Sequence, residues 1–322
     1  MTPSPDRLLG TLLGTAVGDA LGMPIEGLSH TNVRTYYKGI KEYRDDEERG
    51  DLDAGQWTDD TQMTFALVRA LAAHPDPADW PEAAAEAYVG LRDEARRWGQ
   101  TSTAAIDRLA DGTPPEEAGT PDRDSDGAAM RAAPLGAWWA ATEADRDDAF
   151  AAIRPVLSVT HRHPAALAAG WGQAVAVREL LRLDGVEAFE RSAFWQTLVE
   201  HTRWAEDELG EDHRVTERLE ALADCIDSFP LDLGEACDGV GVYADEAWPF
   251  ACAMVARRPH LLENTLLSGI NVGGDADTTG AMMGAQLGAL HGWDAFPDEW
   301  EDGLEDCGRL QEEAQSFADA LR

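Results

Sequence analysis

The chain has 322 residues, of which 44% are hydrophobic, so it can bury a large core and is not intrinsically disordered. Its formal net charge of −35 argues against non-specific nucleic-acid binding, which needs cations to neutralise phosphates. We find no run of about 20 apolar residues and no basic segment followed by an apolar one, so we expect a cytoplasmic protein without a membrane span or secretory signal.

The basic residues are unusual as well, because Lys38 and Lys41 are the only lysines and the other strongly basic residues are arginines. Surface carboxylates hold water and hydrated cations, and high salt screens their mutual repulsion. Two hypotheses follow: adaptation to a salt-rich cytoplasm, or a generally acidic composition. Unfolding at low and at molar salt separates them, because only a salt-adapted protein gains stability in high salt.

The cysteines give no sign of a metal or redox centre. None forms a C-x-x-C pair, and no histidine stands at zinc-finger spacing from them. We expect buried thiols in a reducing compartment. The four are Cys225, Cys237, Cys252 and Cys307.

The pattern along the chain predicts an all-α protein with one domain over residues 1–322. Alanine-rich segments with a period near 3.6 recur, whereas alternating runs of Val, Ile and Thr are scarce. Proline and glycine separate the predicted helices, and the longest loops are predicted at 28–56 and 111–126. The predicted helices are 6–21, 60–74, 81–97, 127–142, 164–183, 192–209, 244–256, 260–270 and 278–291.

Two of these helices carry a glycine at every fourth position. The glycines are Gly10, Gly14, Gly18 and Gly22 in the first helix, and Gly280, Gly284 and Gly288 in the last. Each costs about 1 kcal/mol relative to alanine, so something must offset the loss. Such spacing is typical of membrane helix dimers, but the runs are short and Asp19 interrupts one. We therefore hypothesise that the two helices are central and lie close together in the core.

A cluster of acids and hydroxyls begins the second predicted helix. In Trp57-Thr58-Asp59-Asp60-Thr61, two adjacent carboxylates are flanked by threonine hydroxyls. A helix N-cap with acids in the first turn is one explanation. A cap needs only one oxygen, however, and adjacent carboxylates repel each other unless a cation lies between them.

A second cluster of this kind, GGDADTT at 273–279, precedes the last predicted helix. We expect Asp275 and Asp277 on a turn just before that helix, with Gly273 and Gly274 leaving room for a ligand. Capping explains one aspartate but not both. If the two clusters meet, their oxygens form a ligand set suited to Mg²⁺ or Mn²⁺, and balancing four acids takes about two divalent ions.

With three further segments, these clusters resemble the ADP-ribosylglycohydrolase family, which includes dinitrogenase-reductase-activating glycohydrolase and the eukaryotic ADP-ribosylhydrolases. The similarity follows the chain in order and covers most of it. The similar segments are GTLLGTAVGDALG at 10–22, GQWTDDT at 55–61, DGAAMRAAPLG at 126–136, SVTHRHP at 158–164 and NVGGDADTT at 271–279. The resemblance implies a compact orthogonal helical bundle with a binuclear Mg²⁺ or Mn²⁺ centre. It also implies hydrolysis of the glycosidic bond between ADP-ribose and a protein or small acceptor, through an oxocarbenium-like state.

The resemblance further implies roles for single residues. The metal ligands would be Thr58, Asp59, Asp60, Asp275, Asp277 and Thr278. Glu26 stands where some members carry a catalytic glutamate that orients or deprotonates water or protonates the leaving group, and a surface acid is the alternative. The substrate contacts would be Ser125, Asp126, Gly127, Ala128, Met130, His161, Tyr243, Gly273 and Gly274, the loop at 125–129 presenting backbone N–H groups to the diphosphate.

Some of these assignments have structural alternatives. His161 would line the nucleotide pocket, or would instead fix the loop before Pro164. Tyr243 and Trp248 are candidates for stacking on adenine, although aromatic residues near a helix start are more often part of the core.

Two positions depart from the family pattern. The family usually has asparagine where this chain has Asp126, and a negative charge beside a diphosphate is unfavourable unless a metal or arginine is close. Arginine-specific members tend to have an acid before the turn at Gly99, where this chain has Arg97 and Trp98. A guanidinium leaving group would gain nothing from Arg97, which weakens the case for ADP-ribosyl-arginine as substrate.

Two other classes of protein are considered. A family member that binds ADP-ribose without turnover would also keep these motifs. All-α isoprenoid synthases also hold a diphosphate with acidic helices, but this chain lacks the DDxxD spacing and has few aromatic residues to shelter a carbocation.

Overall fold

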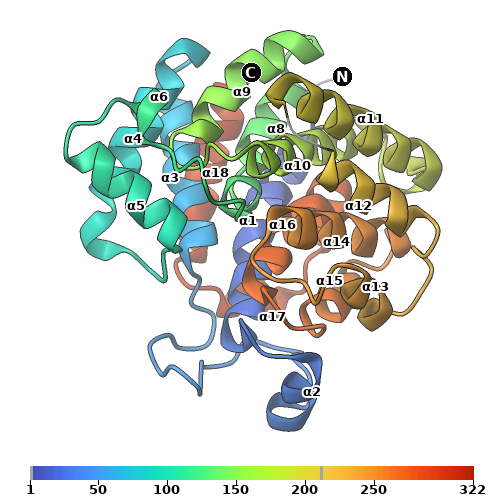
Figure 1. Cartoon of the computed structure of the whole chain (residues 1–322). Coiled ribbons are helices and arrows are strands. Elements are labelled where there is room, and N and C mark those ends of the chain that lie inside the picture. The colour runs from blue at the N-terminus through green and yellow to red at the C-terminus, as the bar shows by residue number, and fades with distance from the viewer. Residues whose placement is uncertain (1–2, 211–212) are drawn as a thin grey trace.

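The computed structural model describes residues 3–210 and 213–322, which form helices and loops with only isolated bridges in place of strands (Figure 1). The all-α prediction is therefore confirmed. The longer helices are α1 (Pro5–Gly22), α3 (Asp59–Ala73), α4 (Trp80–Gly90), α5 (Gln100–Ala110), α8 (Ala133–Ala141), α9 (Arg146–Ser158), α10 (Pro164–Arg182), α11 (Arg191–Leu209), α12 (Arg214–Ala223), α14 (Ala244–Arg257), α15 (Leu262–Ile270), α16 (Ala276–His291) and α18 (Cys307–Ala320). The shorter ones are α2 (His30–Asn32), α6 (Pro115–Ala118), α7 (Gly127–Met130), α13 (Pro230–Ala236) and α17 (Asp298–Gly303).

The centre of the molecule is an antiparallel pair of helices, α1 and α16 (Figure 1). Their glycines face one another: a Cβ atom on Gly18 would lie 1.9 Å from the carbonyl oxygen of Gly280, and one on Gly284 would lie 1.9 Å from that of Gly14. No side chain fits at such distances, so the backbones pack directly on each other. The hypothesis that the glycine-spaced helices are central neighbours is confirmed.

The remaining helices cover this pair. α3 and α18 pack against α1, while α14 and α15 pack against α16, and α10 contacts α16 together with α7, α8 and α11. The segment that contains α2 projects from the body of the molecule, as Figure 1 shows at its lower edge. The α1–α16 seam thus fixes where the C-terminal end of α1 meets the N-terminal end of α16.

Several predicted helix boundaries are wrong. The helix predicted at 81–97 ends at Gly90, and Arg97 lies in a loop with a φ of 55°. The helix predicted at 127–142 breaks between α7 and α8, because Pro134 stands in the first turn of α8. The last predicted helix begins at Ala276 instead of Thr278, so only Asp275 precedes it and Asp277 lies in its first turn.

Four amphipathic helices went unpredicted: α5, α9, α12 and α18. In α18 the buried residues Leu310, Ala314, Phe317 and Ala318 follow the helical period, although charged and amide residues dominate the rest of the segment. The loop predicted at 28–56 contains α2, and the one predicted at 111–126 contains α6. Tertiary burial of a narrow apolar stripe stabilises such helices despite their polar composition.

One helical segment, Pro5–Ile25, is long and apolar enough to cross a membrane, with a mean hydropathy of 1.4. It is not an uninterrupted apolar run, because it contains Asp19. Some 94% of this window is buried inside the protein, which accounts for its apolar composition. Of the cysteines, Cys237 and Cys252 are buried, whereas Cys225 and Cys307 are partly exposed, and all four are free thiols.

Candidate metal centre

Both acidic clusters meet at the end of the α1–α16 seam. Gly22 of α1 lies against Ala276, since a Cβ atom on Gly22 would be 2.2 Å from the Ala276 carbonyl oxygen. This contact places the last turn of α1 beside Asp275 and Asp277. The N-terminal end of α3, with Asp59 and Asp60, lies at the same place because α3 packs against α1.

Asp19, which the sequence analysis left without a role, makes that second connection. Its buried carboxylate accepts hydrogen bonds from the backbone N–H groups of Thr58 and Thr61, each at 3.0 Å, and from the Thr61 hydroxyl at 2.6 Å. It therefore caps α3 from a different helix. An acid in the interior of an apolar, glycine-spaced helix was the available signal, because a buried carboxylate requires partners.

One threonine hydroxyl from each cluster lies beside Asp60. The hydroxyl of Thr58 lies 3.2 Å from Oδ2 of Asp60, and the hydroxyl of Thr278 lies 3.4 Å from the same oxygen. The other oxygen, Oδ1, is buried and has no hydrogen-bond partner among the described residues. A buried carboxylate oxygen without a partner is costly, so the site fits a group that supplies positive charge at this atom.

The carboxylates form two overlapping sets that could hold a cation. Oxygens of Asp19, Asp60 and Asp277 lie within 4.8 Å of one another, as do oxygens of Glu26, Asp275 and Asp277. Asp277 belongs to both sets. Thr58, Asp60, Asp275, Asp277 and Thr278 are buried and connected by these contacts, whereas Asp59 is partly exposed and belongs to neither carboxylate set.

Without a cation, this arrangement is electrostatically unfavourable. Burial, reinforced by the neighbouring acids, raises the pKa of Asp59 to about 8 and the pKa values of Asp60, Asp275 and Asp277 well above their usual range. Burial also raises the pKa of Asp19 to about 6, although its hydrogen bonds oppose the shift. Divalent cations prefer such oxygen-rich sites. The cluster therefore has the composition and burial expected of a divalent metal centre.

The loop before α16 needs both of its glycines. Gly273 and Gly274 have φ values of 84° and 73°, and a Cβ atom on either would lie within 2.2 Å of a carbonyl oxygen. The N–H of Gly274 donates to Leu28, and the N–H of Asp275 donates to Val240 at 2.7 Å. These bonds hold the second cluster between two neighbouring loops.

Glu26 lies at the rim of the cluster, where two arginines contact it. Oε2 of Glu26 is 3.1 Å from Nη1 of Arg49 and 3.4 Å from Nη1 of Arg97. Arg97 also pairs with Asp46, at 2.5 Å, and with Asp51. Burial opposes ionisation of Asp46, but hydrogen bonds from Arg49 and Arg97 outweigh it and lower the pKa of Asp46. We call Glu26, Asp46, Arg49, Asp51 and Arg97 the arginine rim.

The arginine rim adjoins the first cluster directly. The N–H of Gly99, two residues after Arg97, lies 3.4 Å from Oδ2 of Asp59. The turn Arg97–Gly99 therefore connects Glu26 to Asp59. The sequence analysis singled out Arg97 but missed Asp46, Asp51 and Arg49, since nothing in a loop rich in charged residues indicates which of them turn inward.

The predicted phosphate loop packs between α14 and His161. Nε2 of the imidazole is hydrogen-bonded to the Ser125 hydroxyl at 3.1 Å, and Nδ1 is hydrogen-bonded to the Thr160 hydroxyl at 2.8 Å. Burial lowers the pKa of His161 well below its usual value, so the ring is neutral. A Cβ atom on Gly127 would lie 2.7 Å from this ring, so only glycine fits there. His161 thus fixes the loop, whatever else it contacts.

The remaining predicted substrate residues differ in exposure. Ala128 and Met130 are buried, whereas Tyr243 is half exposed and bridges to Ser125. Trp248 is fully buried, and its indole N–H donates to Gln173 at 3.2 Å. The suggestion that Trp248 stacks on adenine is therefore wrong, because the ring belongs to the core.

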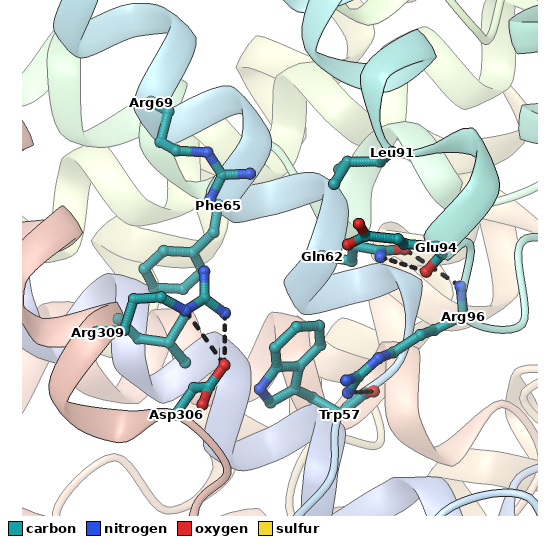
Figure 2. A pocket seen from close by; sticks show the side chains of 10 residues that line it. Trp57, Gln62, Phe65, Arg69, Leu91, Glu94, Arg96, Asp306 and Arg309 are labelled. Atoms are coloured by element: carbon teal, nitrogen blue, oxygen red, sulfur yellow. Dashed lines mark hydrogen bonds and ion pairs between the residues drawn. The ribbon is translucent and has the colours of Figure 1, made fainter.

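A separate cavity of about 470 Å³ lies beside the first cluster (Figure 2). Trp57 and Phe65 line it with three arginines, Arg69, Arg96 and Arg309. The guanidinium of Arg96 lies 4.1 Å from the centre of the Trp57 ring, and acids from α18 and the loop before it pair with all three arginines. Its lining contains none of the acids of the metal centre, so the cavity is distinct from that site.

Comparisons with known proteins agree on one family. A family model described as ADP-ribosylglycohydrolase matches residues 1–322. An uncharacterised protein of Archaeoglobus fulgidus is 31% identical over 95% of this chain and 94% of its own length. The ADP-ribosyl-[dinitrogen reductase] glycohydrolase of Rhodospirillum rubrum is 29% identical over 98% and 95%, and ADP-ribosylhydrolase ARH3 of Homo sapiens is 27% identical over 98% and 93%. A solved structure described as an ADP-ribosylglycohydrolase-related protein complex superimposes with a TM-score of 0.75, at 27% identity over 99% of both chains.

Proposed function

Because this chain belongs to the ADP-ribosylglycohydrolase family, we propose that it is a metal-dependent hydrolase that cleaves the glycosidic bond of ADP-ribose conjugates. The observation that carries the proposal is the convergence of both acidic clusters, with the unpartnered Oδ1 of Asp60 at their centre. The substrates would be ADP-ribosylated proteins or small molecules, as the names of the relatives from Rhodospirillum and Homo sapiens suggest.

The donor set supports two divalent cations, Mg²⁺ or Mn²⁺, since two overlapping groups of carboxylates share Asp277. When bound, such ions polarise substrate oxygens and orient hydroxyl groups. In this chain they would be held by Thr58, Asp59, Asp60, Asp275, Asp277 and Thr278. Asp19 would support these ligands indirectly, because it fixes the backbone at Thr58 and Thr61.

Glu26 is the residue we propose for proton transfer during hydrolysis. One of its oxygens lies within 4.8 Å of the Asp275 and Asp277 ligand atoms, and both arginines contact Oε2. These two ion pairs hold the carboxylate beside the second acidic cluster. The role is that of a general base toward water or a general acid toward the departing acceptor.

Two loops beside the acids are proposed to bind the rest of the substrate. The loop Ser125–Gly127 is held by His161, and the second loop is Gly273–Gly274, directly before Asp275, where Gly273 is buried and Gly274 is partly exposed. Tyr243, bridged to Ser125 and half exposed, is the aromatic group available to a nucleotide base. The alternative function is binding of ADP-ribose without turnover, which the same site would also support.

Release of ADP-ribose tests the proposal. The full-length protein is incubated with Mg²⁺ or Mn²⁺ and a panel of ADP-ribosylated acceptors, and free ADP-ribose is measured with and without a chelator. We expect metal-dependent release that Asp277→Ala abolishes and that Asp302→Ala, a change at an exposed acid, leaves intact. Binding of ADP-ribose with no release from any acceptor would instead establish the non-enzymatic alternative.

A further inference from the structure

Asp126 lies inside the acidic cluster instead of on a free phosphate-binding loop. The residue is only 5% exposed. Both of its backbone polar groups are hydrogen-bonded: its N–H donates to the Val242 carbonyl oxygen at 3.1 Å, and its own carbonyl oxygen accepts from the Ala129 N–H at 2.7 Å. The loop therefore has a set orientation, and the carboxyl group is enclosed by protein.

The carboxyl group of Asp126 faces the second acidic cluster. It forms a hydrogen-bond contact with the carboxyl group of Asp275, and the charges of Asp60 and Asp277 also act on it. Its Oδ2 is buried and has no hydrogen-bond partner among the described residues. Oδ1 of Asp60 is likewise buried without a hydrogen-bond partner, so two unpartnered carboxylate oxygens lie in one cluster.

In the described part of the chain, neither Arg123 nor Arg131 forms an ion pair with Asp126. Arg131 is the basic residue that follows it, and its guanidinium donates to the Gly127 carbonyl oxygen and the Thr160 hydroxyl. A phosphate at this carboxylate would meet repulsion. Two buried carboxyl groups in contact are stable only if they share a proton or if a cation lies beside them.

We propose that Asp126 is an additional carboxylate ligand of the metal centre. The inference rests on the proposed metal centre and deepens it, because it adds a residue from the loop before α7 to ligands from α3 and α16. A hard divalent cation such as Mn²⁺ or Mg²⁺ is the matching partner, since such ions take carboxylate oxygens. The diphosphate of a substrate would then have to bind through other groups.

Metal titration tests this inference without using activity. Mn²⁺ and Mg²⁺ are titrated calorimetrically into the metal-free, full-length protein, into Asp126→Asn and into Asp124→Asn. Asparagine keeps the shape of Asp126 and removes its charge. Asp124, two residues away, is a matched control because its partly exposed carboxylate pairs with Arg214 at 2.7 Å.

We expect Asp126→Asn to weaken divalent binding roughly 10- to 100-fold, while Asp124→Asn leaves the affinity within about twofold. Asp126→Ser, which also removes the carboxylate, should reproduce the loss if the asparagine variant folds poorly. Thermal unfolding of each metal-free variant checks that the loss does not come from unfolding.

Equal or tighter metal binding by Asp126→Asn would overturn the inference, because a proton shared between Asp126 and Asp275 predicts that result. If the unaltered protein binds neither Mn²⁺ nor Mg²⁺, the proposed metal centre itself fails. The two failures are therefore distinguishable in one series of titrations.

Discussion

The α1–α16 seam and the arginine rim both border the metal centre, but they are built in opposite ways. The seam consists of backbone packed on backbone, where glycines such as Gly18 and Gly280 leave no space for a side chain. The rim consists of long charged side chains, such as Arg97 and Arg49, that bridge an irregular loop to Glu26. One region tolerates no added atom, and the other depends on side-chain charge.

Because of this difference, the two regions have different roles at the site. Close-packed backbone positions groups accurately because it can hardly deform, so the seam determines where the carboxylates of α3 and α16 meet. Ion pairs at a rim are more adaptable and respond to salt. We infer that the rim governs which acceptor reaches the carboxylates, and four experiments can test the division.

The largest effect is expected from Gly18→Ala. The added methyl group would lie 1.9 Å from the Gly280 carbonyl oxygen, so the helices must separate. We expect the free energy of unfolding to fall by roughly 3 kcal/mol, measured by denaturant unfolding. Gly90→Ala, at the end of α4 where nothing lies within 4 Å, is the control and should change stability by less than about 1 kcal/mol. Similar small effects for both variants would contradict a rigid seam.

The next largest effect is expected from Glu26→Gln. If Glu26 transfers a proton, turnover should fall by roughly 100-fold or more while ADP-ribose binding persists, because the amide keeps the size but cannot act as acid or base. Steady-state hydrolysis and calorimetry provide the two measurements. Glu48→Gln, a change at an exposed acid of the neighbouring loop, serves as control. Near-normal turnover by Glu26→Gln would exclude the proposed role.

A third experiment uses pH. In the metal-free protein, burial raises the pKa of Asp59 to about 8 and that of Asp19 to about 6, from 3.8. The folded chain then binds more protons than the unfolded chain between about pH 4 and pH 8, so stability falls as pH rises through this window. Saturating Mg²⁺ or Mn²⁺ should raise Tm at pH 8 by roughly 5 °C or more, and by less at pH 5. An increase of the same size at both pH values would indicate binding elsewhere.

The smallest effect is expected at the arginine rim. A guanidinium beside Glu26 disfavours a cationic leaving group, so kcat/KM should be several-fold higher for a hydroxyl-linked conjugate than for an arginine-linked one. Arg97→Gln should reduce this ratio, whereas Arg92→Gln, which removes an exposed ion pair with Asp107, should not. Because the ratio is taken within each variant, partial unfolding does not affect it. An unchanged ratio in Arg97→Gln would assign the rim a purely structural role.

Much of the site was predictable because its chemistry is local in the sequence. The segments at 57–61 and 273–279 each contain more acids than a helix cap requires, and the four-residue glycine spacing indicated a partner helix. The structure brings these segments together as the spacing suggested. Asp19 could have been added on the same reasoning, since it is an acid among the buried residues of α1.

Other features could not be predicted, because they depend on contacts between distant segments. The orientation of Asp126 is set by Val242, and the pairing of Arg97 with Asp46 and Asp51 depends on how the loop at 38–56 folds back. Trp248 is an aromatic residue near a helix start, yet neighbouring helices enclose it completely. None of these contacts leaves a periodic or compositional signal.

The sequence by itself determined the helical class, the two acidic clusters and the glycine seam, because period, residue type and spacing are properties of short segments. Only the tertiary structure decided that Asp19 caps α3, that two arginines form ion pairs with Glu26 and that Asp126 faces Asp275. These are interactions of charged groups, whose free energy depends on burial and on separation in space. Position along the chain specifies neither quantity.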